Sequence, residues 1–283
     1  MKTNLLKSMH AVLFMAAMFL VSCDNNNNND LQGTETEEEQ TLESASISED
    51  ETDDVLGITY QSETKLASTG GRVRTTSCAL VTNDKKNNVI TIDFGDGCVG
   101  SHGRERSGKI FIAYSHEIGD SLANRIITFE NYFVNNKSIT GTIELRDVSV
   151  NEVGNLQSVK RLIDLTITFP NGDRTVFNGD RTREWLSGDG DDDPSNNVYK
   201  ITGSVEGISN TGRSFTHVIV EPIIADWSCA AHGNFARISG VVEMTKLKGY
   251  SARKRTVDYG DGECDNVITI TTFKRTYVVT IDH

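Results

Sequence analysis

From about residue 70 onward, apolar and polar residues alternate along the chain with a period of two. In residues 139–146 every odd position is apolar or glycine and every even position is polar. The same alternation recurs in residues 163–169 and 199–206. Because successive side chains of a strand point to opposite faces, this pattern predicts strands with one buried face and one hydrated face.

Turn-forming residues separate these segments at short intervals. They are Asn83-Asp84, Asn135-Asn136, residues 170–173, residues 210–212 and Lys248-Gly249. We therefore expect about 12 strands between residues 88 and 281, and short connections make neighbouring strands antiparallel. A sheet of this size cannot hide its apolar face while flat. The fold class is thus an all-β antiparallel meander whose curved sheet forms a barrel, a sandwich or a covered groove.

Four of the expected strands share a short motif in which serine or threonine precedes glycine. The motif starts at Ser107, Thr140, Thr202 and Ser239. Glycine inside a strand costs stability, so its recurrence predicts bends or bulges where the sheet curves. The alternative, that Thr-Gly is simply common in exported β-rich proteins, stays open.

A longer motif occurs near each end of the β region. Residues 90–98 read Ile-Thr-Ile-Asp-Phe-Gly-Asp-Gly-Cys, and residues 255–264 repeat the order of strand, aromatic residue, Gly-Asp-Gly and cysteine. In this the sequence resembles envelope lipoproteins of Bacteroidota whose globular part begins and ends with such hairpins. The resemblance covers roughly residues 70–283 and implies an envelope location without implying an activity.

The N-terminus has the features of an export signal. Lys2 and Lys7 precede an apolar run over residues 11–21, which ends in Ser22-Cys23. This run is shorter than the roughly 20 residues that a membrane-spanning helix needs. Residues 20–23 resemble a lipobox, so we expect residues 1–22 to be a lipoprotein signal peptide and Cys23 to carry lipid. An ordinary signal that ends near a cysteine is the alternative.

The segment after Cys23 is strongly acidic. Residues 24–54 hold 12 of the 40 acidic residues, and only 2 of the 28 basic residues precede residue 55, so the remainder has a net charge of −2. Few apolar residues occur there, which predicts a disordered acidic tether over residues 23–54 and a single domain over 55–283. A nearly neutral domain argues against nucleic acid as a partner.

Four cysteines remain once Cys23 is assigned to lipid: Cys78, Cys98, Cys229 and Cys264. An even number in an exported chain predicts two disulfides. Of three possible pairings we favour Cys78–Cys98 with Cys229–Cys264, because each pair flanks the same motif. In the chain-entropy description each bond stabilises the fold by about 3 to 4 kcal/mol. A metal site is disfavoured, since no two cysteines are close in sequence.

Two aspartates and one acidic loop are candidates for chemistry. Asp96 and Asp261 of the Gly-Asp-Gly motifs would form a carboxylate pair if they met in space, but turn formation explains them better. A weak calcium candidate consists of Asp189, Asp191 and Asp193. That loop departs from an EF-hand, with proline at its sixth position and lysine at its twelfth, so a solvated hairpin tip is favoured and no metal site is predicted.

Two further features are candidate binding surfaces. Trp185 would stack on a sugar ring, although a core or rim aromatic is the favoured interpretation. A basic hairpin would contact anionic glycans or lipid headgroups, although the charged rim of an edge hairpin is favoured. Its residues are Lys246, Lys248, Arg253, Lys254 and Arg255.

The six histidines are scattered, and no nucleophile elbow, phosphate loop or zinc-binding helix motif is present. We therefore expect no cofactor and, more often than not, no enzyme. The leading hypothesis is a lipoprotein of the outer membrane, facing the periplasm or the cell surface, that binds or displays a glycan, lipid or protein ligand. The alternatives are a carrier of an apolar ligand in the curled sheet and a glycan-acting enzyme with paired carboxylates.

Overall fold

The computed structural model describes residues 28–69, 71–74, 78–100, 103–115, 124–188, 193–209, 212–248 and 251–281. A long helix, α1 (Asn28–Thr69), precedes a large sheet, and a short helix, α2 (Trp227–Ala231), lies between two of its strands. The strands are β1 (Arg72–Arg74), β2 (Leu80–Asp84), β3 (Val89–Asp93), β4 (Cys98–Val99), β5 (Glu105–Tyr114), β6 (Arg125–Val134), β7 (Lys137–Val150), β8 (Leu156–Thr168), β9 (Arg174–Ser187), β10 (Val198–Ile208), β11 (Ser214–Asp226), β12 (Arg237–Lys248), β13 (Ser251–Asp261), β14 (Val267–Thr271) and β15 (Thr276–Thr280).

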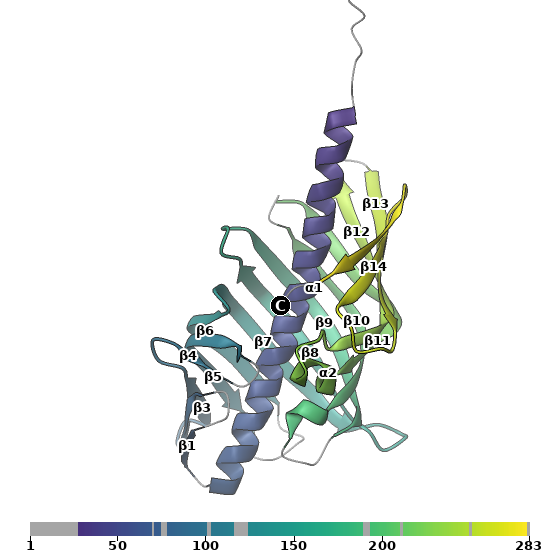
Figure 1. Cartoon of the computed structure of the whole chain (residues 1–283). Helices are drawn as coiled ribbons and strands as arrows, with labels where there is room; N and C mark the ends of the chain where they lie inside the picture. Colours follow the sequence, from purple (N-terminus) through teal and green to yellow (C-terminus); the bar gives the residue numbers. More distant parts are fainter. Residues whose placement is uncertain are drawn as a thin grey trace, which may run out of the picture.

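The strands form one antiparallel sheet in chain order. Apart from β4, which pairs with β5 beside the main path, each strand is hydrogen-bonded to its neighbours in sequence, from β1 at one edge to β15 at the other. The predicted all-β antiparallel meander is therefore confirmed. The sheet curves strongly without closing into a barrel, and its hollow side faces α1 (Figure 1).

The recurring glycines mark the places where the sheet bends. Gly108, Gly141, Gly203 and Gly240 all have positive φ angles, between 79° and 110°. The pairing register shifts at or beside each of them. At Gly240 an added Cβ would lie 2.4 Å from the carbonyl oxygen of Pro222, so no larger side chain fits there without movement. The bulges predicted from the motif are present.

The two Gly-Asp-Gly hairpins have the same local structure. Asp93 and Asp258, each two residues before the first glycine, accept a hydrogen bond from the backbone N–H of Gly95 and Gly260. The aromatic residues that follow these aspartates, at positions 94 and 259, are both buried in the core. Each end of the sheet is thus fixed by a polar turn outside and an aromatic ring inside.

Both favoured disulfides are present. Cys78 is bonded to Cys98, with Cα atoms 6.2 Å apart, and Cys229 to Cys264, with Cα atoms 5.3 Å apart. They close loops of 20 and 35 residues in sequence. One bond ties the segment between β1 and β2 to β4, and the other ties α2 to the loop after β13.

The structure corrects the expectation of a disordered acidic tether. Residues 28–54 belong to α1, and the boundary placed at residue 55 falls in the middle of this helix. The helix runs through the hollow of the curved sheet, with its N-terminal end beyond the strand ends (Figure 1). From Glu49 to Asp54, basic groups elsewhere in the fold bind the carboxylates of this helix, and the composition of the segment alone does not reveal those partners.

The predicted signal peptide and Cys23 lie outside the described residues. Within the described part of the chain, no helix has the length and the apolar character that crossing a membrane requires.

An acidic helix in a cationic trough

The centre of α1 is enclosed on all sides. Residues 48–56 are all buried, and seven of these nine residues are polar or acidic. Because successive residues of a helix are about 100° apart, nine buried in a row leave no direction around the axis open to solvent. Burying so many carboxylates demands cations nearby. We call the hollow face that surrounds this segment the trough.

Glu49 is the most completely paired carboxylate of α1. Its Oε1 lies 2.6 Å from a guanidinium nitrogen of Arg181 and 3.0 Å from Nδ1 of His217, and its Oε2 lies 2.9 Å from Arg237. These partners come from β9, β11 and β12, between 132 and 188 residues away in sequence. One glutamate therefore joins three strands.

Asp53, one helical turn after Glu49, belongs to the same network. It accepts from Nζ of Lys160 at 2.5 Å and from Arg237 at 3.0 Å. Arg237 thus bridges the two carboxylates, and residues four apart on a helix share a face. The shared arginine fixes this face of α1 toward β8–β12.

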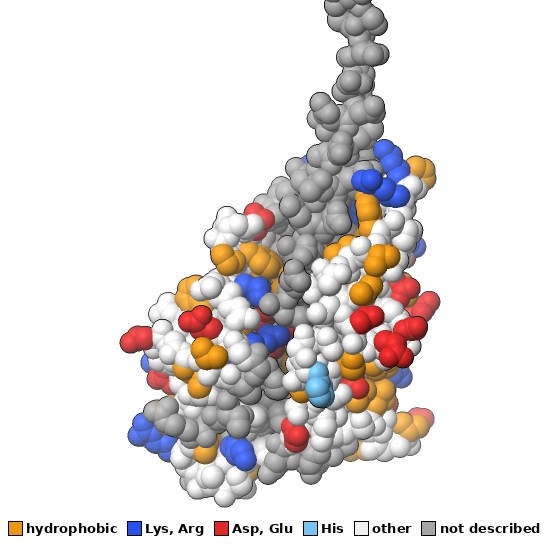
Figure 2. All heavy atoms as spheres, in the orientation of Figure 1, with side chains coloured by type: hydrophobic (Ala, Val, Ile, Leu, Met, Phe, Trp, Pro, Cys, Tyr) orange, Lys and Arg blue, Asp and Glu red, His pale blue; other side chains and the backbone are white. Residues whose placement is uncertain are grey.

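A second network lies on another face of the helix. Arg104 contacts Asp50 at 3.1 Å and Glu51 at 2.8 Å, and Arg106 contacts Asp54 at 2.8 Å. Both arginines come from the start of β5 or the residue before it. The helix therefore forms ion pairs with both sides of the curved sheet. Figure 2 shows basic side chains in the hollow between the two sides.

Two further pairs extend the contact along α1. Lys137 at the start of β7 lies 2.8 Å from Glu51, and Arg125 at the start of β6 lies 2.8 Å from Glu63. Both carboxylates are buried. The paired cations of the trough therefore come from β5 through β9 and from β12. Because side chains alternate between the two faces of a strand, each of these residues points to the hollow side of the sheet.

The surrounding charges set the protonation of the central network. Burial alone would raise the pKa of Glu49, but Arg181, Arg237 and His217 outweigh it and hold that pKa well below its usual range. Burial likewise opposes ionisation of Asp53, yet its pKa is lowered, chiefly by Lys160 and then Arg237. Both carboxylates are therefore charged at neutral pH.

His217 behaves differently from its neighbours. Burial lowers the pKa of its imidazole, although Glu49 acts in the opposite direction. The ring is therefore neutral at pH 7, and because Glu49 is ionised and can only accept, Nδ1–H of His217 donates to it. No histidine had been singled out from the sequence, since a lone histidine in a strand carries no motif.

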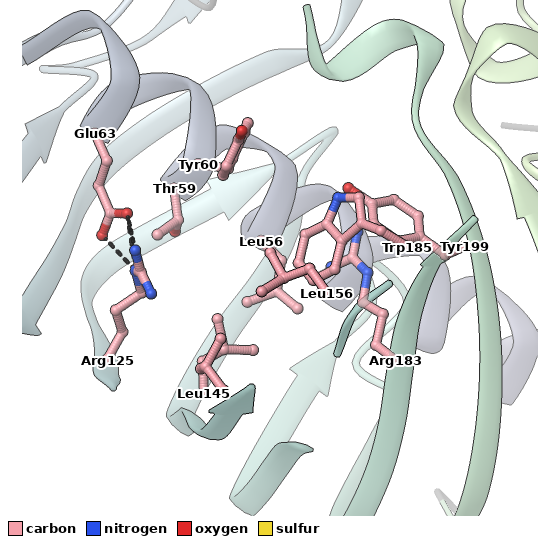
Figure 3. Close-up of a pocket in the computed structure, with 11 residues that line it drawn as sticks. Leu56, Thr59, Tyr60, Glu63, Arg125, Leu145, Leu156, Arg183, Trp185 and Tyr199 are labelled. Carbon is pink, nitrogen blue, oxygen red and sulfur yellow. Dashed lines mark hydrogen bonds and ion pairs between the residues drawn. The ribbon is translucent and has the colours of Figure 1, made fainter. Parts of the chain in front are cut away.

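A small cavity remains between α1 and β7–β10. Its walls include Leu56 of the helix, Leu145 and Leu156 of the sheet, and the rings of Trp185 and Tyr199 (Figure 3). Its volume is about 30 Å³, which is room for about two water molecules or a small ion. With α1 in place, this cavity does not have the size that a lipid carrier needs.

Trp185 lines this cavity from the inner face of β9. Its ring meets that of Tyr199 edge to face, with centroids 4.9 Å apart, and only 6% of the residue is exposed. The favoured interpretation as a core aromatic is confirmed, and stacking on a sugar at the surface is not supported. Arg183 lies over both rings, 3.4 Å from the centroid of Tyr199.

Asp96 lies in the turn after β3, whereas Asp261 is the last residue of β13 and pairs with Ser239 of β12. Both are exposed, and eight strands of the sheet order separate β3 from β13 (Figure 1). The hydrogen bonds that hold these turns come from the preceding aspartates, at positions 93 and 258. The turn interpretation is supported for Asp96 only, and in both motifs the side chain that accepts the hydrogen bond is the aspartate three residues earlier, at position 93 or 258.

The acidic loop is described only in part. Asp189 and Asp191 lie outside the described residues, whereas the carboxylate of Asp193 accepts from N–H and Oγ of Ser195 at 2.9 and 2.5 Å. It thereby caps the single 3₁₀ turn Pro194–Asn196. Among the described residues no group of three histidine, cysteine or acidic side chains could hold a metal ion.

The basic hairpin is split between two faces of the sheet. Lys254 is exposed and pairs with Glu243 of the neighbouring strand, whereas Arg255 is buried on the hollow side. The side chains of Lys246, Lys248 and Arg253 lie outside those described. At least one of the five residues is therefore part of the trough and not of the rim.

Comparisons with protein-family models, curated proteins and solved structures find no match to this chain.

Proposed function

We propose that this protein is a non-enzymatic lipoprotein of the bacterial outer membrane, acylated at Cys23, in which α1 is a rigid stalk that carries the sheet. The observation that supports this most directly is that α1 is one continuous helix. The helix starts at Asn28, five residues after the expected lipid site, and runs unbroken into the trough. Ion pairs from Glu49 to Glu63 fix it there.

The stalk changes how the domain stands relative to the membrane. A helix of 42 residues is about 63 Å long, and residues 28–44, which precede the enclosed part, account for about 25 Å. A flexible coil would let the domain lie in any orientation, whereas a helix fixed at its far end holds one. The protein thus presents the same part of its outer surface to the envelope.

In this proposal the outer surface of the sheet binds or displays the ligand, because α1 fills the centre of the hollow. The carrier alternative would require the helix to leave, and leaving would separate six buried carboxylates from their cations. They are Glu49, Asp50, Glu51, Asp53, Asp54 and Glu63. The paired-carboxylate alternative is not favoured, because Asp96 and Asp261 are exposed and eight strands of the sheet order separate β3 from β13.

Mass spectrometry of the mature protein from bacterial membranes tests the anchor. We expect an N-terminal peptide that begins at Cys23 and carries acyl chains, and we expect Cys23→Ala to move the protein to the soluble fraction. The matched control is the double variant Cys78→Ala/Cys98→Ala, which removes two cysteines that form a disulfide and should remain with the membrane. A mature peptide that begins elsewhere, or a free thiol at position 23, refutes lipidation.

A distance measurement tests the stalk independently of the lipid. Spin labels at Thr36→Cys and Ala67→Cys, in a Cys23→Ala background, are 31 residues apart and should give a narrow distribution near ~46 Å if α1 is continuous. A broad distribution would show that the first part of the segment is a coil, and the stalk proposal would fail even if Cys23 is acylated.

A further inference from the structure

Arg183 is a buried cation that the acidic helix leaves without an ion pair. The six carboxylates of α1 contact seven lysines and arginines of the trough, but within the described residues none lies within 4 Å of Arg183. Asp53 attracts Arg183 electrostatically, but from beyond that distance. Only 3% of this arginine is exposed, and its Nε has no hydrogen-bond partner. An unpaired buried charge is unfavourable, so the site favours an anion.

The guanidinium of Arg183 borders the cavity between α1 and β7–β10. Figure 3 shows it against the rings of Trp185 and Tyr199, beside Leu156 and with Leu56 of the helix close by. Ring faces hold the guanidinium plane in one orientation. Arg183 thus borders a small space whose other walls are mainly hydrocarbon, with Thr59 and the ion pair of Glu63 and Arg125 also in its lining.

The walls and the size of the cavity define the chemistry that fits. A volume of about 30 Å³ excludes sugars, nucleotides and long acyl chains. A multiply charged ion such as phosphate would lose too much hydration against leucine side chains. A carboxylate matches a guanidinium, carries a single charge, and can bear a short alkyl group for the apolar wall.

We propose that this cavity, which we call the Arg183 site, binds a short-chain monocarboxylate whose carboxylate accepts from Arg183 inside the cavity and whose alkyl group extends past Leu56 and Leu156 toward the opening. The ligand therefore bridges α1 and the sheet and supplies the close anionic partner that the helix does not. Tyr60, Val148 and Leu156 line the cavity and are partly exposed, so it reaches the surface of the molecule. This inference is independent of lipidation at Cys23.

Titrating the purified full mature chain with formate, acetate, propionate and butyrate tests the proposal. Trp185 borders the site and Trp227 is the second of the two tryptophans, so binding should change the intrinsic fluorescence saturably. Affinity should rise from formate to propionate as the alkyl group fills the apolar wall. Chloride and gluconate at equal ionic strength serve as reference anions.

Arg183→Met is the decisive variant, because it removes the charge but keeps a chain of similar length. We expect it to weaken carboxylate binding at least tenfold while the protein stays folded, since no ion pair is lost. Arg161→Met, on the outer face of β8, is the matched control and should bind as the wild type does.

Three outcomes would overturn the proposal. They are the absence of a saturable signal, equal affinity for chloride and the carboxylates, and binding that Arg183→Met leaves unchanged. The second would mean that the Arg183 site holds an adventitious ion only. A melting temperature that rises with propionate in the wild type but not in Arg183→Met would support it, because a ligand that binds only the folded state stabilises that state.

Discussion

Asp180 and Arg181 are neighbours on β9, yet their side chains lie in opposite environments. Arg181 points into the trough, where it meets Glu49 at 2.6 Å with only 1% and 4% of the two side chains exposed. Asp180 points outward and meets Arg161 at 2.8 Å with 42% and 41% exposed. The two ion pairs have nearly the same geometry and differ in their contact with water.

The contrast between these pairs indicates which ion pairs determine this fold. A surface pair exchanges hydration for a screened attraction, so its net contribution is small. A buried pair has already lost its hydration, so removing one partner leaves a charge with no compensation. Because buried charges tolerate little misplacement, the inner network also fixes the rotation and the register of α1.

The largest effect is expected for Glu49→Gln. This change leaves Arg181 and Arg237 buried with one carboxylate fewer between them, and we expect a loss of about 3 to 5 kcal/mol in the free energy of unfolding. Urea denaturation followed by circular dichroism measures it. The amide protons of α1 should also exchange faster than those of β7 and β8, since the helix loses its strongest attachment.

Glu130→Gln on the outer side of β6 is the control for this comparison. Its carboxylate is 57% exposed and lies 3.6 Å from Lys109, so the change should stay within about 0.5 kcal/mol of the wild type. If Glu49→Gln also stays within 1 kcal/mol, the inner network does not hold the helix and the comparison fails.

The inner network should make the free energy of unfolding fall in two steps as the pH is lowered. His217 has a folded pKa below its unfolded value near 6.5, so the unfolded state binds its proton first and stability begins to fall as the pH drops below about 6.5. Glu49 and Asp53 also have lowered pKa values in the fold, so their contribution is full above about pH 5 and is lost as the pH falls through the unfolded and then the folded values.

Thermal melts between pH 3 and pH 8 test this order. His217→Phe should remove the upper step, and an unchanged step in that variant would assign it to another group. Each proton taken up on unfolding corresponds to a slope of about 1.4 kcal/mol per pH unit, which sets the scale of either step. A stability that stays flat from pH 8 to pH 3 would contradict the buried network itself.

Much of the sheet could be predicted from the sequence because its signals are local. The alternation in residues 139–146 depends only on which side of one strand faces water. The glycines of the Thr-Gly and Ser-Gly motifs indicate positions where the backbone adopts a positive φ angle. Gly141 and Gly240 have such angles, and both lie at register shifts. The disulfides were assigned correctly because each pair flanks a motif that the chain repeats.

The helix and its site could not be predicted because their cause is distant in sequence. Composition alone makes residues 28–54 too polar to fold, but the groups that neutralise Glu49 follow it by 132 to 188 residues. The net charge of the domain is also close to zero, and this single number does not show that basic and acidic residues are separated between its two faces. Acidic residues four apart, as at Glu49 and Asp53 or Asp50 and Asp54, were the available signal for a helix with charged faces.

A much smaller effect than that of Glu49→Gln is expected for Asp180→Asn, which removes the outer partner of Arg161 and Arg146. Hydrogen bonds from Arg161 lower the pKa of this carboxyl, but water reaches every member of the cluster, so the freed guanidinium groups are rehydrated at once. We expect a change several-fold smaller than that of Glu49→Gln, and one that fades between 0.05 and 1 M salt as screening increases. The Glu49→Gln effect should persist over the same range, because water and salt hardly reach the ion pairs around Glu49, whose side chains are at most 4% exposed. Parallel urea titrations of both variants at the two salt concentrations measure this, and equal salt sensitivity would mean that the inner pairs are as open to solvent as the outer ones.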